Sequence, residues 1–271
     1  MNLGGELIRL KNLRYLPVVA GDLVYTDGET VLGVQPRGKV LARFADEGGV
    51  RLIASHLDQV GLVCSASLPP NHEGFIDRYL VYCRIVELPL FIVLNKIDEM
   101  DEEQVTKVLP FEDAGVDIYP TSATTGKGMK ELSERLQRGI TVLSGLSGVG
   151  KSTIINWLLN EDIPTREVSE STGRGRHTTT AIEAYDFHET LLIDTPGIKK
   201  FGFLGIKRSD IIKGFPEFEP FAEQCHFDDC LHLDETNCAV KEAVEEGEIE
   251  ERRYRAYVEM METIEEEQRP R

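Results

Sequence analysis

The apolar positions of the chain change their period along its length. Up to about residue 45, short valine and leucine runs lie between the turn signals 20–22 and 26–28, which predicts a small β-rich module. From about residue 52, strand-like runs alternate with helical segments, which predicts an α/β fold with a mostly parallel sheet covered on both faces by helices. The expected strands are 59–64, 90–94, 141–143 and 191–193, and the expected helices are 74–86, 101–109, 128–137 and 151–159.

After about residue 205 the helical period returns, with a cysteine-rich interruption before Ala239. The glutamate-rich tail beyond Ala239 has apolar positions that predict two helices. We therefore expect three regions: a β module over 1–45, a nucleotide-binding domain over 46–205 and a helical domain over 206–271.

Charge and apolar run length narrow the possible partners. The net charge of −17 disfavours broad contact with nucleic acid or an anionic membrane, so an RNA contact needs a local basic patch. Such a patch is expected around Lys199, Lys200, Lys207, Arg208 and Lys213. The apolar run 90–94 is too short to span a bilayer, and no secretory signal is recognised, so we expect a cytoplasmic protein without a membrane partner. Nothing in the sequence indicates an obligate dimer, and a monomer is expected.

A glycine-rich segment predicts a phosphate-binding loop. Residues 145–152, Gly-Leu-Ser-Gly-Val-Gly-Lys-Ser, match G-x-x-x-x-G-K-[ST] between an expected strand and an expected helix. The backbone N–H groups and the helix N-terminus would bind phosphate oxygens, Lys151 would reach the β- and γ-phosphates, and Ser152 would hold Mg²⁺. The expected nucleotide contacts of this segment are Gly145, Ser147, Gly148, Val149, Gly150, Lys151, Ser152 and Thr153.

A guanine-recognition motif precedes that loop, which reverses the usual order. Asp98 of Asn95-Lys96-x-Asp98 would accept from guanine N1–H and N2–H₂, Lys96 would cover the base, and Asn95 would tie the two loops together. The weaker pair Ser122-Ala123 would offer a backbone N–H to guanine O6. All parts of one pocket are therefore expected on a circularly permuted chain.

The hydrolytic end of the pocket follows the phosphate loop. Asp194 of Asp194-Thr195-Pro196-Gly197 would steer Mg²⁺, and the Gly197 N–H would contact the γ-phosphate. In the segment 171–180, Thr178 or Thr179 would join Mg²⁺ when the γ-phosphate is bound. The residue after Gly197 is Ile198, which cannot orient water. Either a partner completes the site, or His177 acts through a hydrogen bond to water.

Three cysteines and a histidine predict a structural zinc site. The candidate ligands are Cys225, Cys230, His232 and Cys238, with His226 as a spare imidazole. Three thiolates and one imidazole suit tetrahedral Zn²⁺ with no open position. The two other cysteines, Cys64 and Cys83, lie in apolar stretches and are expected in the core.

Together these motifs make the chain resemble the small-subunit-dependent GTPases of bacterial ribosomes, the RsgA/YjeQ family. The matching segments are 58–60, 77–80 (Asp-Arg-Tyr-Leu), 95–98, 145–152, 175–180, 194–197, the four zinc ligands and Arg253-Tyr254-x-x-Tyr257. The resemblance implies a GTP- and GDP-binding hydrolase with Mg²⁺ and one Zn²⁺, acting in late 30S maturation and contacting 16S rRNA. It also implies an N-terminal oligonucleotide-binding (OB) barrel, here shortened. His177 matches the family's proposed catalytic histidine and Thr179 its switch threonine.

Two other functions remain open at this point. A phosphate-loop ATPase or small-molecule kinase is disfavoured by Asp98 and by the lack of an acceptor-substrate motif. A non-enzymatic or regulatory RNA-binding zinc protein would use the nucleotide only as a switch.

Overall fold

The computed structural model describes residues 2–3, 6–7, 10–12, 15–44, 50–161, 182–195, 203 and 206–268. The chain divides into two compact units. Unit 1 comprises residues 1–71 and 90–202, and unit 2 comprises residues 72–89 and 203–271. The three regions expected from the sequence, divided near residues 45 and 205, stay a prediction.

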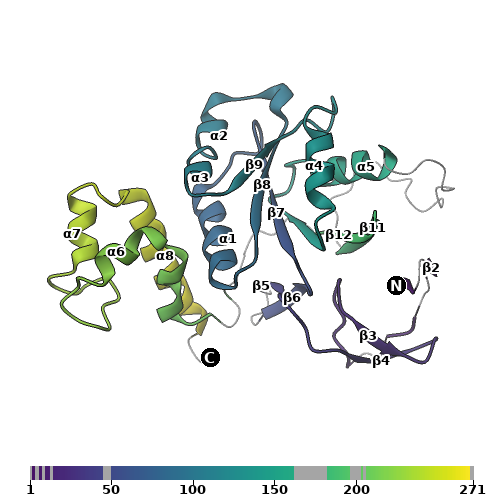
Figure 1. The fold of residues 1–271 in the computed structure, drawn as a ribbon, viewed down its shortest axis with the longest axis horizontal. Coiled ribbons are helices and arrows are strands. Elements are labelled where there is room, and N and C mark those ends of the chain that lie inside the picture. The colour runs from purple at the N-terminus through teal and green to yellow at the C-terminus, as the bar shows by residue number, and fades with distance from the viewer. Residues whose placement is uncertain are drawn as a thin grey trace. The chain divides into compact units, whose positions relative to one another are not determined.

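Unit 1 is built around a six-stranded sheet in the order β11-β12-β10-β7-β8-β9 (Figure 1). The strands β7 to β10 and β12 pair in parallel, and β11 pairs antiparallel with β12 at one edge. All described residues of β7 and β10 are buried, as continuous apolar runs in the middle of a parallel sheet require. The bounds are β7 (Gln59–Ser65), β8 (Leu90–Asn95), β9 (Asp117–Pro120), β10 (Thr141–Ser144), β11 (Glu183–Phe187) and β12 (Thr190–Asp194).

The four predicted strands are confirmed, and the two that the sequence pattern missed are the edge strands β9 and β11. Both edge strands leave most of their residues exposed or half-buried. They therefore lack the apolar run by which the central strands were recognised.

The helices of unit 1 agree with the sequence prediction except at one place. They are α2 (Glu102–Thr106), α3 (Pro110–Asp113), α4 (Met129–Leu136) and α5 (Lys151–Glu161), with the short 3₁₀ helix η1 (Ile97–Glu99). The helix expected over 101–109 is present but shorter, because α2 ends at Thr106. A second short helix, α3, begins at Pro110, just beyond the expected range, with the proline in its first turn, where a missing N–H is tolerated.

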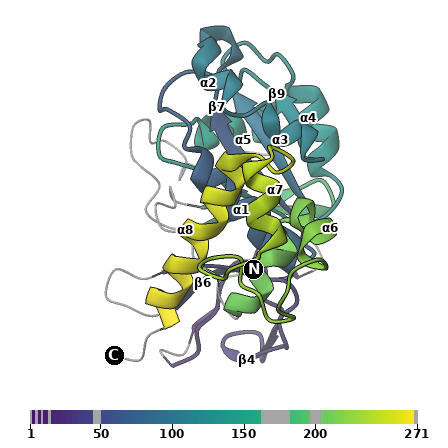
Figure 2. The ribbon, with the colours of Figure 1, turned by 90° about the vertical axis from the view of Figure 1, so that its left-hand side faces the viewer.

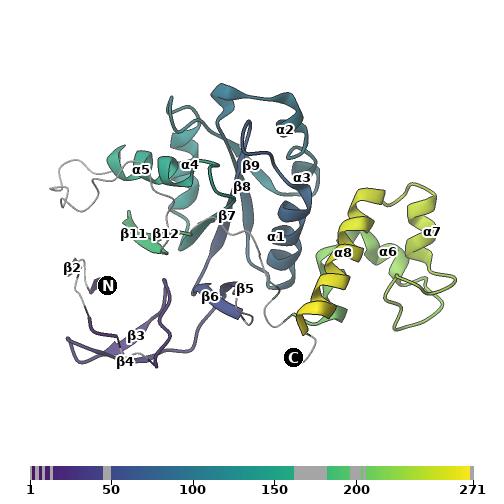
Figure 3. The ribbon, with the colours of Figure 1, turned by 180° about the vertical axis from the view of Figure 1, so that it is seen from behind.

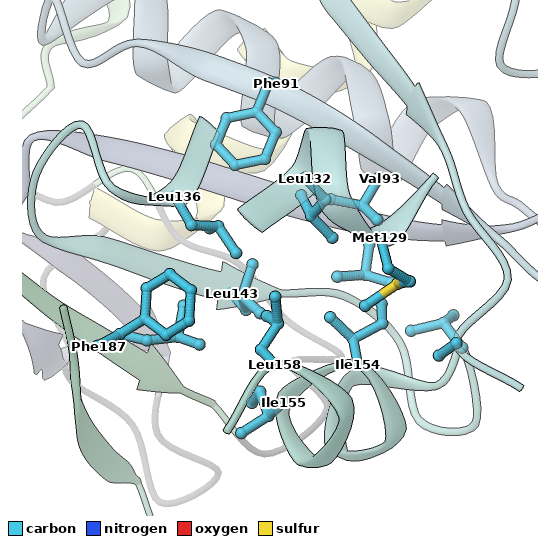
Figure 4. Close-up of a cluster of buried hydrophobic side chains, with 14 residues drawn as sticks. Phe91, Val93, Met129, Leu132, Leu136, Leu143, Ile154, Ile155, Leu158 and Phe187 are labelled. Atoms are coloured by element: carbon cyan, nitrogen blue, oxygen red, sulfur yellow. The ribbon is translucent and has the colours of Figure 1, made fainter. Parts of the chain in front are cut away.

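A buried cluster joins α4 and α5 to one face of the sheet (Figure 4). Helix α4 contributes the predicted stripe of Met129, Leu132 and Leu136, all at most 1% exposed. Its partners include Phe91, Val93, Leu143, Ile154, Ile155, Leu158 and Phe187. Helices α2 and α3 lie on the other side of the sheet, as Figures 1 and 3 show from opposite directions. The prediction of helices on both faces is therefore confirmed.

The first 54 residues form three antiparallel strand pairs. They are β1 (Asn2–Leu3) with β2 (Glu6–Leu7), β3 (Val24–Thr26) with β4 (Val31–Val34), and β5 (Leu41–Phe44) with β6 (Val50–Ala54). Asp22 links their loops by accepting from Arg37 Nε at 2.7 Å and Ser55 Oγ at 2.6 Å. Burial alone would raise the pKa of Asp22, but the hydrogen bonds from Arg37 and Ser55 hold it below the usual value. The β-rich character is confirmed, and closure into an OB barrel stays a prediction.

Unit 2 is helical (Figure 2). It contains α1 (Glu73–Ile85), η3 (Arg208–Gly214), η4 (Pro216–Phe218), α6 (Glu219–Ala222), α7 (Ala239–Glu245) and α8 (Glu251–Gln268), and the two predicted tail helices are α7 and α8. Asp77 of α1 accepts from Arg252 Nη1 at 2.7 Å and from Arg253 of α8. Arg253 also donates to Glu217 at 2.7 Å and lies over the Phe215 ring. These contacts pair the buried Asp77 charge, as burial of a carboxylate requires.

The described helices include none that is long and apolar enough to cross a membrane. The two cysteines expected in the core, Cys64 and Cys83, are buried at 4% and 2% exposure.

Candidate nucleotide site and zinc cluster

The nucleotide-site motifs lie at the carboxyl ends of neighbouring parallel strands. Asn95 ends β8, the phosphate loop follows β10, and Asp194 ends β12. The register pairs Asn95 with Ser65 and Asp194 with Leu143, so these strands end at one edge of the sheet. That edge is the usual ligand position of open α/β sheets.

The phosphate loop has a backbone that only glycines allow. Gly145, Gly148 and Gly150 have φ of +149°, +88° and +100°. A Cβ on Gly145 would lie 2.3 Å from the Val63 carbonyl oxygen, and one on Gly150 would lie 2.3 Å from Asn95 Nδ2. The glycines therefore permit the close approach of backbone that a phosphate cradle needs.

Lys151 is buried at the start of α5, at 7% exposure. Its Nζ donates to the carbonyl oxygens of Gly145 at 2.7 Å and Leu146 at 2.9 Å. Burial lowers the pKa of Lys151 to about 8, against the opposing effect of the Asp194 carboxylate. A buried ammonium group beside the loop backbone is suited to an anionic ligand, because the negative charge of the ligand would compensate the buried positive charge.

The guanine motif and the phosphate loop are joined through Asn95. Asn95 Nδ2 donates to the Val149 carbonyl at 3.0 Å, which confirms the predicted tie between the two loops. Its Oδ1 accepts from the Ala123 N–H at 3.2 Å and the Thr121 hydroxyl at 3.3 Å. The buried Asn95 amide thus connects the guanine motif, the phosphate loop and the loop at residues 121–123.

Asp98 is exposed and is held by hydroxyl groups. Thr124 Oγ1 donates to Asp98 Oδ2 at 2.9 Å. Hydrogen bonds from Ser122 and Thr124 keep the pKa of Asp98 below its usual value, so its carboxylate stays charged. Lys96 is in the left-handed region, and its Nζ donates to the Leu68 carbonyl. The Thr124 contact was not foreseen, because nothing in the sequence separates Thr124 from the adjacent Thr125.

Of the residues expected to bind Mg²⁺, the structure describes Ser152 and Asp194. Asp194 is buried at 2% exposure at the end of β12, and the exposed Ser152 and Thr153 begin α5. Thr195, the next residue, donates from Oγ1 to the Leu143 carbonyl at 2.9 Å, which anchors the chain after Asp194. The predicted residues Gly197, His177 and Thr179, together with Ile198, lie outside the described residues. A carboxylate and a hydroxyl are oxygen ligands of the kind that Mg²⁺ takes.

The predicted zinc ligands come together in unit 2. The ligand atoms of Cys225, Cys230, His232 and Cys238 all lie within 4.8 Å of one another. His232 Nδ1 lies 3.5 Å from Cys225 Sγ and 3.4 Å from Cys238 Sγ, and these two sulfurs are 3.9 Å apart. Tetrahedral Zn²⁺ with ordinary bond lengths places sulfurs about 3.8 Å apart and sulfur and nitrogen about 3.5 Å apart. The cluster therefore fits one zinc ion.

Tyrosines of α8 fix the loop that carries the zinc ligands. Tyr254 donates to the His232 carbonyl and Tyr257 to the Leu231 carbonyl, both at 2.8 Å. Burial lowers the pKa of His232, which favours the neutral imidazole that binds metal. His226 is absent from the described cluster, and its ring instead meets Phe227 edge-on at 4.8 Å. The structure therefore gathers His232, and not His226, with the three cysteines.

Comparison with known proteins agrees with this geometry. Residues 34–204 match the model of the RsgA GTPase family. A protein of Actinobacillus succinogenes, named "Small ribosomal subunit biogenesis GTPase RsgA", is 38% identical over 94% of this chain and 78% of its own length. A protein of the same name from Photorhabdus laumondii is 39% identical over 86% of this chain and 69% of its own length.

Solved structures show the same fold. YjeQ from Thermotoga maritima has a TM-score of 0.70 at 35% identity, covering 96% of this chain and 90% of its own. YloQ, described as a circularly permuted GTPase, has a TM-score of 0.64 at 27% identity, covering 95% and 84%. The predicted class is thus confirmed as an α/β fold of circularly permuted GTPase type with a zinc cluster in its helical part. By sequence and by structure, the chain belongs to the RsgA GTPase family.

Proposed function

We propose that this protein is a GTPase that acts in the biogenesis of the small ribosomal subunit, with GTP or GDP, Mg²⁺ and one structural Zn²⁺ as its bound groups. The observation that supports this proposal is the hydrogen bond from Asn95 to the Val149 carbonyl, which joins the guanine motif to the phosphate loop. The names of the relatives supply the ribosomal role, which the pocket by itself does not indicate.

The residue roles follow the donor and acceptor groups of the pocket. Asp98 accepts the guanine N–H groups and Lys96 covers the base. The Ser122-Ala123 pair would offer a backbone N–H to O6, although the Ala123 N–H also donates to Asn95 Oδ1. The phosphate loop from Gly145 to Thr153 binds the phosphates through backbone N–H groups, and Lys151 supplies the buried positive charge. Ser152 and Asp194 hold Mg²⁺, which offsets charge on the phosphates.

Hydrolysis depends on residues in the segments around His177 and Gly197. His177 would hydrogen-bond the attacking water, Thr179 would join the magnesium ligands, and the Gly197 N–H would contact the γ-phosphate. Ile198 replaces a water-orienting side chain, so stimulation by the ribosomal subunit fits a site that is incomplete until a partner binds.

The partner is the 30S subunit and the nucleic acid contact is 16S rRNA, reached by a cytoplasmic monomer. On a chain of net charge −17, cations that lie close together in the sequence would bind RNA phosphates: Lys199 and Lys200, which lie outside the described residues, and Lys207, Arg208 and Lys213. Such binding weakens steeply with salt, because phosphate contacts release counterions.

The function is tested by GTP turnover with and without purified 30S subunits across a salt series. We expect slow turnover alone, strong stimulation by subunits and loss of stimulation at high salt. Turnover that stays negligible with subunits present would contradict the proposal and favour a non-enzymatic nucleotide switch.

The pocket assignment is tested by Asp98→Asn. An amide presents one donor and one acceptor where the carboxylate presents two acceptors, so guanosine should lose affinity and xanthosine gain it. We expect GDP affinity to fall by about 100-fold, since two hydrogen bonds to a charged group are lost. Unchanged GDP affinity would remove Asp98 from the pocket.

A further inference from the structure

A threonine outside the recognised motifs contacts the guanine-reading carboxylate. Thr124 Oγ1 donates its one proton to Asp98 Oδ2 at 2.9 Å. The same oxygen lies 3.0 Å from Ser122 Oγ, and the Ser122 hydroxyl also hydrogen-bonds the Asp98 carboxylate. Ser122 Oγ also accepts from the Thr125 N–H at 3.1 Å. The hydroxyl groups of Ser122 and Thr124 therefore converge on the Asp98 carboxylate.

The turn that carries Thr124 is itself fixed. The Gly126 N–H donates to the Ser122 carbonyl at 2.8 Å, and the Ser122 N–H to the Lys127 carbonyl at 2.9 Å. The Ala123 N–H donates to Asn95, which contacts the phosphate loop. Thr124 is thus held in place by the same bonds that join the guanine motif to the phosphate loop.

Asp98, in contrast, lies at the surface and is restrained through the hydroxyl groups of Ser122 and Thr124. It is exposed and lies in the short 3₁₀ helix η1. An exposed carboxylate rotates freely, and ordering it during binding costs conformational entropy. A carboxylate oxygen has two lone pairs, so Oδ2 can accept from Thr124 and from the base at the same time.

We propose that Thr124 is a positioning residue for guanine selectivity, because its hydroxyl orients the Asp98 carboxylate before the nucleotide binds. This inference rests on the proposed function and extends it to a residue outside the guanine motif. Thr124 would affect the discrimination between guanosine and adenosine nucleotides. It would not affect the contacts to the phosphates, which both kinds of nucleotide share.

The test compares GDP and ADP affinities of the full chain by competition. Thr124→Val keeps the shape and removes the hydroxyl, Thr124→Ser keeps the hydroxyl, and Thr125→Val is a matched control at the neighbouring exposed threonine. We expect Thr124→Val to weaken GDP binding about tenfold with unchanged ADP binding, since one hydrogen bond to a charged group is lost. Thr124→Ser and Thr125→Val should keep the GDP to ADP ratio within about twofold of the original.

Binding can be followed through Trp157, the only tryptophan of the chain. Its Nε1 lies 3.4 Å from where a Cβ on Gly126 would stand, so it reports on this turn. If the original protein does not prefer GDP over ADP, the proposed function fails. If it does, but Thr124→Val keeps the ratio or weakens both nucleotides equally, only the positioning role fails. Thr124→Ala carries the same expectation if Thr124→Val does not fold.

Discussion

The nucleotide site and the zinc cluster are assembled in opposite ways. The zinc ligands lie between residues 225 and 238 on one loop, whereas the nucleotide site gathers strand ends from residue 95 to residue 194. The hydrogen bonds of Asn95 and Thr124 are formed by the protein alone. In the zinc cluster, burial raises the pKa of Cys230 to about 12, so its thiolate needs the ion. The pocket is therefore ordered by contacts between strand ends, and the zinc loop by the Tyr254 and Tyr257 hydrogen bonds together with its ligand.

The largest effect should come from breaking the zinc cluster with Cys230→Ser. Losing one thiolate weakens a metal whose binding contributes on the order of 10 kcal/mol to the folding of small zinc modules. We expect zinc content to fall below one per chain and thermal unfolding to occur at lower temperature, measured by metal analysis and circular dichroism. A chelator should do the same to the unaltered chain.

His226→Gln is the matched control, because this imidazole lies beside the cluster without joining it. It should keep both the metal and the unfolding temperature. Full zinc content in Cys230→Ser, or loss of zinc in His226→Gln, would contradict the assigned ligands.

The next effect comes from Gly150→Ala, which tests whether the sheet's framework orders the pocket. The added Cβ would stand 2.3 Å from Asn95 Nδ2, so the link from Asn95 to Val149 must break. We expect GDP affinity to fall by about 30- to 100-fold from strain and the lost hydrogen bond. Isothermal titration calorimetry measures this change in GDP affinity.

Gly115→Ala is its control. Gly115 also has positive φ, at +81°, but a Cβ there meets nothing within 4 Å. It should lower stability by about 1 kcal/mol from backbone strain and leave GDP affinity unchanged. Equal GDP losses in the two variants would mean that strain, and not the Asn95 contact, sets the affinity.

The smallest effect is a pH dependence at Lys151. Its pKa of about 8 lies below the ordinary value because of burial, and phosphate binding favours the protonated form. GDP affinity should therefore be nearly flat below pH 7 and fall by up to about tenfold by pH 9, with proton uptake on binding.

The Lys151→Arg variant checks this assignment, because arginine stays protonated throughout that range. The GDP affinity of this variant should change less with pH than that of the unaltered chain. Any titration of the nucleotide itself contributes equally to both profiles. Parallel profiles would show that another group sets the pH dependence.

Local patterns were sufficient for the central strands, for the zinc ligands and for both nucleotide motifs. They failed at β9 and β11, because edge strands bury too few residues to make an apolar run. They also placed the end of the helix expected over 101–109 too late, since α2 ends at Thr106.

The sequence by itself predicted the nucleotide and zinc motifs, because each motif is a short run whose spacing is complete within one loop or strand end. Only the tertiary structure decided how those runs meet. Asn95 reaches Val149 across 54 residues, Thr124 reaches Asp98 across 26, and Arg252 reaches Asp77 across 175. Such contacts depend on sheet order and loop geometry, and these follow from the packing of the whole core.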